Sequence, residues 1–550
     1  MDPRRTSPTL TSRTAALMLL LAGVAFGEAA LAQNLDIGLR FSETQRYGTA
    51  RSLGTGNAMA AIGADWTAAL SNPAGLGAYR NNEVTLTVGG LAYGASASSL
   101  DGDALDLSAS DFDVVLPQVA IVFTREPIGS RWTQLNFGFG VSQTSRFEEL
   151  IAYGGNSAGS ITDFLAERAN DFYDGVPFAP DELGDFDTGL AFDVGALIPF
   201  DDFVPGGRER YTTDYINDRA ERAPAGASLE EIFADPGANL EKDGRVARSG
   251  QVSSFDFTFG GNFAERLLVG ATLGLVNSRF EETDFYQEAD AADEVFAFER
   301  ASFRQTTVLE ATGVLGRIGI IYRASQALRV GLAYHSPTVS AIDDDYATRF
   351  RYAFDDGGAA GDNAAESPAF EPLEYTFVSP SQYRASVAGV FGRRGFAGLE
   401  VGYINYAGGR FNLDGEDAFE EQVNRALEES LRGAFQVNLG GELNLTPGTS
   451  ENAFRVRAGF EWLGTPIAEV NGQLEDAAYA VAAGLGYRYN RLSLDLAYRH
   501  TVRPDRVYRP YTVDDFNQFF PQPEVVYSPT LGSASLTAGW KLVPRYYEGD

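Results

Sequence analysis

Few residues of this chain are of the types that carry out nucleophilic chemistry. The sequence has no cysteine and two histidines, His335 and His500. His335 directly precedes Ser336, and a hydroxyl beside a histidine base is the arrangement of a nucleophilic hydrolase. Ser336 is followed by Pro337 at the end of an expected strand, however, so a histidine that hydrogen-bonds to a neighbouring loop explains the same residues. We favour this second interpretation and expect no catalytic residues and no enzyme activity.

Acidic residues are abundant, and the formal net charge is −32. Binding of nucleic acid needs clustered lysine and arginine, so this excess argues against a nucleic-acid partner. Acidic runs such as residues 343–345 and 355–356 have none of the spacing of a calcium-binding loop. Solvated loops account for them more simply than a metal site does, and we expect neither a metal nor another cofactor.

The N-terminus has the pattern of a secretory signal. Arg4 and Arg5 precede an apolar run over residues 15–26, and the small residues of 30–32 fit a cleavage site before Gln33. The run is too short and too rich in glycine for a membrane anchor. We therefore expect residues 1–32 to be removed on export.

Alternation of apolar and polar side chains dominates the rest of the chain. Successive side chains of a strand point to opposite faces, so each such segment has one apolar and one polar face. A soluble sandwich seldom places Arg, Glu and Asp opposite a continuous apolar band so many times, whereas a barrel in lipid has apolar side chains outside and polar ones inside. Around residues 453–464 the apolar face consists of Phe454, Val456, Ala458, Phe460 and Trp462.

The alternation predicts an all-β protein, a transmembrane antiparallel β-barrel of about 14 strands in the outer membrane of a Gram-negative cell. An even number of strands returns both ends to the periplasmic side. The expected strands lie near 83–93, 114–124, 133–147, 251–261, 266–280, 302–323, 327–350, 373–391, 395–412, 432–444, 453–464, 477–489, 491–503 and 533–542.

Long and short connections alternate between these strands, as is usual for such barrels. Long loops are expected at 148–250, 281–301, 351–372 and 504–532, on the outer side of the membrane. The first of them is too long to lack structure, and residues 161–172 have helical spacing. Glycines recur on the expected lumen faces, where a bulge, a close backbone approach or free lumen volume would each explain them: Gly270, Gly274, Gly331, Gly389, Gly402, Gly440 and Gly459.

A small-residue segment precedes the first strand. Residues 66–70 have helical character, and Asn72 before Pro73 should end that helix. This segment, with Asn72, Pro73 and Ala74 inside the run Ala-Leu-Ser-Asn-Pro-Ala-Gly-Leu, resembles the FadL/TodX family of outer-membrane transporters for long-chain fatty acids and aromatic hydrocarbons. The runs at 260–275, 329–337 and 380–386 are also similar to that family.

The resemblance implies a hatch, carrying the motif Asn72, Pro73 and Ala74, inside the barrel. We accordingly divide the chain into a signal peptide (1–32), a hatch (33–82), the barrel (83–542, with the partly helical loop 148–250) and a C-terminal tail (543–550). The tail departs from the usual aromatic C-terminal residue of such barrels, since it ends in Glu548, Gly549 and Asp550.

The resemblance also implies passive transport of hydrophobic small molecules, with the hatch as a movable stopper and a sideways exit beside it. Partners would then be a hydrophobic ligand and membrane lipid, and we expect a monomer. A general polar-solute porin and a surface adhesion barrel remain alternatives. Loop aromatics are candidates for ligand capture: Phe164, Phe172, Tyr173, Phe178, Phe285, Tyr286, Phe296 and Phe298.

Arginines on the expected lumen faces are candidates to bind a ligand carboxylate, because guanidinium matches carboxylate geometry. An alternative is a structural lumen network with the acidic residues Glu310, Glu400, Glu461 and Asp495. The six candidate arginines are Arg304, Arg317, Arg329, Arg384, Arg455 and Arg457.

Overall fold

The computed structural model describes residues 37–42, 47–98, 107–170, 178–200, 210–225, 237–355, 360–413, 417–447, 452–468, 477–511 and 523–542, with the single residues 100, 227, 232, 235 and 415. The predicted signal peptide (1–32) and tail (543–550) lie outside these residues. Among the described residues, no helix has both the length and the hydropathy that a membrane crossing requires.

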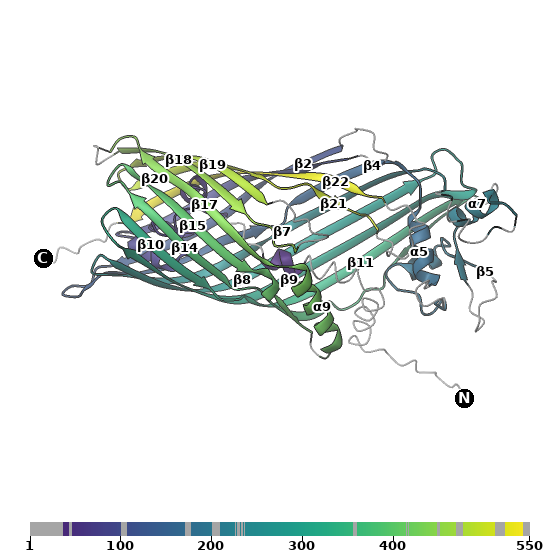
Figure 1. Cartoon of the computed structure of the whole chain (residues 1–550), viewed down its shortest axis with the longest axis horizontal. Coiled ribbons are helices and arrows are strands. Elements are labelled where there is room, and N and C mark those ends of the chain that lie inside the picture. The colour runs from purple at the N-terminus through teal and green to yellow at the C-terminus, as the bar shows by residue number, and fades with distance from the viewer. Residues whose placement is uncertain are drawn as a thin grey trace, which may run out of the picture.

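The chain forms a closed antiparallel barrel of fourteen strands (Figure 1). The ring closes where the first strand pairs with the last, for example Val84 with Trp540. The predicted barrel is therefore confirmed, and each predicted strand overlaps one strand of the ring. Several observed strands extend further than predicted, and the predicted strands 327–350, 373–391 and 395–412 are each divided between a ring strand and a second strand. In ring order the strands are β1 (Asn82–Ala97), β2 (Leu107–Arg125), β3 (Trp132–Arg146), β7 (Leu240–Phe263), β8 (Leu267–Ala289), β9 (Ala297–Arg323), β10 (Leu328–His335), β14 (Gln382–Val390), β15 (Gly395–Asn405), β17 (Gly433–Asn444), β18 (Asn452–Leu463), β19 (Ala478–Tyr489), β20 (Leu492–Val502) and β22 (Val525–Leu542).

The strands differ strongly in length. β8 and β9 have 23 and 27 residues, whereas β17 to β19 have 12 each. The long strands continue past the short ones toward α5 and α7, so one side of the barrel wall is much taller (Figure 1). The predicted loop at 281–301 is thus largely strand, and this prediction is wrong. Shorter strands complete the tall side: β4 (Glu149–Ser157), β11 (Val339–Asp355), β12 (Ala360–Glu366), β13 (Leu373–Val378), β16 (Arg410–Asn412) and β21 (Arg506–Tyr508).

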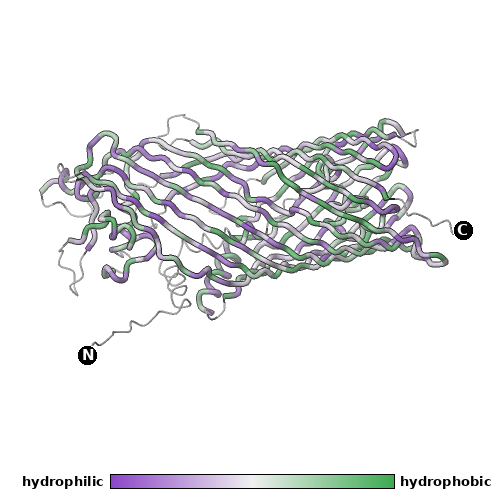
Figure 2. Tube along the Cα trace, turned by 180° about the vertical axis from the view of Figure 1, so that it is seen from behind, coloured by the Kyte–Doolittle hydropathy of each residue, from purple (hydrophilic) through white to green (hydrophobic). Residues whose placement is uncertain are grey.

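The barrel has an exposed apolar band around its shorter part. Along β7 the outward side chains Phe259, Phe257 and Phe255 are exposed, and the outward positions then become polar, ending in Asp243 and Glu241. Figure 2 shows the same change, from green-rich strands in the shorter part to purple-rich strands in the tall part. Polar side chains such as Glu400 and Asp495 are buried on the inner face of the band.

The tall part, here called the collar (the described residues of 149–250, 281–303, 340–366 and 506–527), has its own core. It contains α5 (Ile161–Asn170), α6 (Thr188–Asp193), α7 (Asp214–Arg222) and the small sheet of β5 (Ile198–Phe200) and β6 (Arg210–Thr212). Inward side chains of the strands pack with Leu165 of α5 and Tyr215 of α7. These strand side chains include Ile151, Tyr286, Phe298 and Phe350.

Four of the six predicted capture aromatics that the structure describes belong to this core. Tyr286 and Phe298 are buried, and Phe164 and Phe178 pack against the same cluster. The prediction that these side chains form an exposed surface is wrong, because the tall strands enclose them. Phe285 lies beside Arg304, Phe296 is 66% exposed, and Phe172 and Tyr173 lie outside the described residues.

A buried ion pair joins α5 to α7. Asp163 pairs with Arg219, and both side chains are almost fully buried. Burial raises the pKa of Asp163 to about 6, and the Arg219 guanidinium opposes this shift. A carboxyl can escape an unfavourable buried charge by protonation, whereas a guanidinium cannot.

We therefore expect Asp163→Asn to destabilise the collar more than Arg219→Met. The first change leaves a permanent buried cation without its carboxylate, at a cost of about 3–5 kcal/mol. The second leaves a carboxyl that can take up a proton. Limited proteolysis of the purified barrel should show earlier cleavage around α5 and α7 in Asp163→Asn. Equal cleavage of the two variants would contradict the expectation.

A second buried cluster lies where residues 37–42 meet α9 (Asp417–Ser430). Phe419, Val423 and Leu427 on one face of α9 pack with Ile37, with an isoleucine of β11 and with aromatic side chains of β13 and β16. The described residues nearest the N-terminus are thus held inside the barrel wall, beside the mouth of the short strands.

Candidate functional site

Residues 47–79, the part of the predicted hatch that is described here under that name, lie inside the barrel and are almost completely buried. The elements of the hatch are α3 (Ala50–Gly54), α4 (Trp66–Ser71) and the 3-10 helix η1 (Pro73–Ala78). Thr49 caps α3 by accepting a bond from Ser52, and Asp65 caps α4. Asn72 ends α4, as predicted for the residue before a proline, and its side chain also caps η1.

The motif Asn72, Pro73 and Ala74 contacts the barrel wall. Asn72 Nδ2 donates to the backbone oxygens of Ile320 (3.1 Å) and Leu332 (3.4 Å), while Oδ1 accepts from the Ala74 amide (3.1 Å). The asparagine therefore both shapes the hatch turn and fixes it to β9 and β10.

Glycines of the wall leave space for the hatch backbone. A side chain on Gly270 would overlap Pro73, and one on Gly440 or Gly459 would overlap the Thr55 backbone. Close backbone approach, one of the explanations left open by the sequence, is thus the reason for these glycines. Gly331 also faces the hatch, whereas Gly274 and Gly402 face wall side chains, and Gly389 points outward, contrary to prediction.

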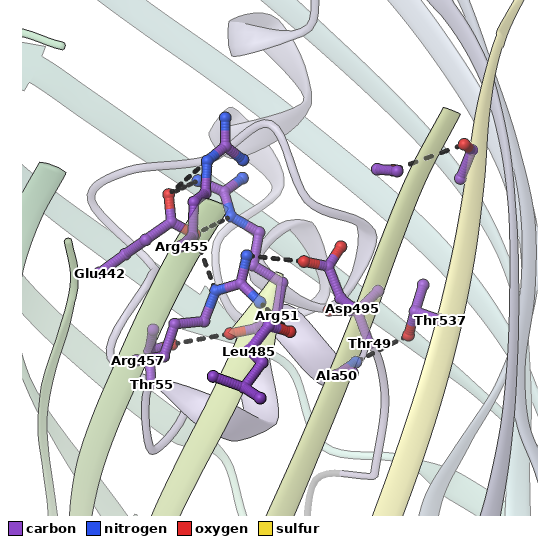
Figure 3. A network of polar contacts seen from close by, with 12 residues as sticks. Thr49, Ala50, Arg51, Thr55, Glu442, Arg455, Arg457, Leu485, Asp495 and Thr537 are labelled. Atoms are coloured by element: carbon purple, nitrogen blue, oxygen red, sulfur yellow. Dashed lines mark hydrogen bonds and ion pairs between the residues drawn. The ribbon is translucent and has the colours of Figure 1, made fainter. Parts of the chain in front are cut away.

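A buried charge network fixes the hatch to a second part of the wall (Figure 3). Arg51 of α3 pairs with Glu442 of β17 at 3.0 Å. The same carboxylate accepts from Arg457 at 2.8 Å, and Arg455 lies 3.6 Å from it. Arg457 also pairs with Asp495 at 2.7 Å. Burying charges is costly unless they are paired, so these contacts require the hatch to be in place.

A second carboxylate, Glu461, repeats the arrangement. It accepts from Arg499 (3.0 Å) and from the amide of the hatch residue Asn57 (3.1 Å). Two strands of the wall thus present carboxylates that are each shared between a wall arginine and a hatch side chain.

The six candidate arginines are not all in the lumen. Arg304 is exposed, lies over the Phe285 ring and is on the same face of β9 as Val314 and Ile318, so its predicted lumen position is wrong. Glu310 is also exposed and pairs with Arg279. The error arose because the outward face of β9 becomes polar above the apolar band.

The other five candidates face inward and have protein partners. Arg317 pairs with Asp256 (2.6 Å), and Arg384 pairs with Glu400 (3.0 Å). Arg329 donates to the hatch carbonyl of Ile62 at 2.9 Å. With Arg455 and Arg457 in the network around Glu442, these arginines form the structural lumen network that the sequence left as an alternative.

His335 contacts the hatch directly. It is buried, and its Nε2 lies 3.0 Å from the backbone oxygen of Ser71, the residue before Asn72. The Ser336 hydroxyl donates to the Pro337 backbone oxygen. This geometry gives His335 a structural contact with the hatch.

A cavity of about 70 Å³ lies above the hatch, between residues 41–42 and the walls of β7, β8, β9 and β11. Its lining combines hydroxyl and apolar side chains: Phe41, Ser42, Thr144, Val252, Ser254, Val276, Ser278, Ala311, Leu315, Arg317, His335, Ser336, Thr338, Ser340, Ser379 and Gln382. In the part of the chain that the structure describes, no group of His, Asp and Glu could hold a metal ion.

The wall is thin at β3. Trp66 of the hatch packs against Gly138 and Gly140, where an added side-chain carbon would lie 2.5 and 2.6 Å from the indole ring. Its Nε1 donates to Ser142 (3.0 Å). On the outside, an apolar depression of about 280 Å³ lies between exposed side chains such as Phe139 and Phe257 and reaches Gly140.

No family model and no curated protein matches the sequence. Solved structures do match. A FadL homologue of Pseudomonas aeruginosa is 12% identical, with a TM-score of 0.49, and 90% of this chain covers 99% of that one. The toluene transporter TbuX of Ralstonia pickettii is 14% identical (TM-score 0.45; 91% and 100% covered), and the toluene transporter TodX of P. putida is 12% identical (TM-score 0.46; 92% and 100% covered).

Proposed function

We propose that this protein belongs to the FadL/TodX family and carries hydrophobic small molecules, either long-chain fatty acids or hydrocarbons, passively across an outer membrane. The single observation that supports this best is a closed barrel that has an apolar outer band and a lumen filled by the hatch, which is held by hydrogen bonds and ion pairs rather than by strand pairing. The solved structures named above include toluene transporters. A filled lumen favours this function over a general polar-solute porin.

The apolar band of the barrel supports the membrane placement. Lipid accepts a barrel whose outward side chains are apolar and whose backbone groups are all paired between strands. The collar then stands on the outer side, because it carries the long connections. Capture of ligand by the collar, for which the exposed Phe296 is available, is part of the proposal.

The thin wall at β3 is our candidate for the sideways exit. The hatch side chain Trp66 covers Gly138 and Gly140 from inside, and the apolar depression lies on their outer side. A ligand that leaves here enters lipid without crossing water. Ligand binding drives this movement only if it favours the displaced hatch over the docked one.

Removal of the Trp66 side chain is expected to increase transport. Trp66→Ala deletes the packing against β3, which lowers the stability of the docked hatch by about 3–5 kcal/mol. Uptake of radiolabelled oleate and hexadecane should be measured in cells lacking this gene, with the wild-type protein or the variant restored. We expect uptake with the wild type and faster uptake with Trp66→Ala.

Trp132→Ala is the matched control, because Trp132 lies in β3, the strand that Trp66 packs against, but its ring meets Phe263 edge to face, away from the hatch. Uptake should stay at the wild-type level in this control. Equal uptake with and without the protein would reject the transport function. Equal effects of the two tryptophan variants would reject only the exit at β3.

A further inference from the structure

We propose that the cavity above the hatch binds an uncharged oxygen group, a hydroxyl or a carbonyl, at the end of an otherwise apolar ligand. This inference rests on the proposed transport function and specifies its ligand.

The cavity has the size of a ligand head rather than of a whole ligand. A water-sized group needs roughly 10–15 Å³ of such volume, so 70 Å³ holds about five of them. The apolar lining at Val276, Ala311 and Leu315 suits the first carbons of a chain, and the hydroxyls of Ser278, Thr338 and Ser340 suit a polar end.

Ser278 is the residue that points to a ligand. Its side chain is 97% buried in the cavity wall, and its hydroxyl has no hydrogen-bond partner among the described residues. A buried hydroxyl without a partner costs free energy, which a bound donor or acceptor would recover. A second buried oxygen without a partner is Oδ2 of Asp256, the carboxylate that pairs with the cavity residue Arg317.

The charge of the cavity argues for a neutral ligand head. Among the described residues that line the cavity, Arg317 is the one with a permanent charge, and its guanidinium is 2.6 Å from Asp256 Oδ1. Ser254 donates to the same oxygen at 2.9 Å. Asp256 already matches the Arg317 charge, so a carboxylate that approached Arg317 would also approach the Asp256 carboxylate, and two like charges repel at low dielectric. A hydroxyl or a carbonyl meets no such repulsion.

The test compares three twelve-carbon ligands. Radiolabelled 1-dodecanol, dodecane and dodecanoate are equilibrated at pH 8 with the full protein in lipid nanodiscs, and empty nanodiscs give the background. We expect the tightest specific binding for dodecanol. Tighter binding of dodecanoate, or equal binding of dodecanol and dodecane, would overturn the inference. Binding of dodecane alone would leave the transport proposal standing, whereas absence of all three would count against both.

Two variants locate the contact. Ser278→Ala should weaken dodecanol binding about 5-fold, the effect of one lost hydrogen bond, and leave dodecane unchanged. Ser493→Ala, a lumen-wall change outside the cavity lining, is the control and should change neither. Asp256→Asn frees the Arg317 charge and should reverse the order, so that dodecanoate binds more tightly than dodecanol. Equal weakening of all ligands in Ser278→Ala, or an unchanged order in Asp256→Asn, would overturn the inference.

Discussion

Glu442→Gln should release the hatch from the barrel wall and produce steady ion conductance in planar bilayers. The neutral amide leaves Arg51, Arg455 and Arg457 close together, with Asp495 as the remaining carboxylate of the network. Removing one partner of a buried ion pair costs about 3–5 kcal/mol. Undocking of Arg51 relieves part of that cost, so the equilibrium constant between the docked and the undocked hatch should shift toward the undocked state by a factor of about 100 or more.

The matched control for this experiment is Glu310→Gln. Glu310 also pairs with an arginine, but the pair is exposed on the outer face, where such pairs contribute little. Both variants should keep the folded barrel, seen as resistance to unfolding by detergent at room temperature. A closed, non-conducting Glu442→Gln barrel would show that the charge network does not hold the hatch.

Gly270→Ala should displace the hatch by overpacking rather than by loss of charge pairing. The added methyl group overlaps the Pro73 backbone, which cannot rotate away as a flexible side chain would. Overpacking of this kind costs about 1–3 kcal/mol. We expect intermittent conductance in planar bilayers, because the docked and displaced states approach equal stability.

Gly402→Ala adds the same methyl group to the lumen face at a position away from the hatch. Its new carbon would lie 3.4 Å from Arg384 and 3.6 Å from Gln436, which is ordinary contact. This control should remain closed. Similar conductance in the two glycine variants would mean that the effect is a general weakening of the wall.

The strands could be predicted from the sequence because the apolar band imposes a period of two on one face. This alternation of apolar and polar residues is lost above the band. Residues 281–289 are in a strand, but both faces there carry polar side chains, so the alternation predicts no strand at these positions. α9 was also missed, although Phe419, Val423 and Leu427 recur at helical spacing and carried enough signal to find it.

The site was only partly predictable. The turn at Asn72 and Pro73 follows from local chemistry, since proline restricts the residue before it. The partner of each arginine does not, because it depends on the register between strands that are far apart in sequence. Arg457 and Asp495 meet only because β18, β19 and β20 pair in the observed register. Nothing local distinguishes Arg457 from Arg304.

The height of the collar sets the distance between its rim and the bilayer. Along β7 the outward phenylalanines end at Phe255, and the strand continues to Leu240. At about 3.3 Å per residue and a strand tilt of about 40°, the rim stands about 40 Å beyond the lipid tails. Under the proposed function, an apolar ligand would thus first meet the protein well outside the bilayer.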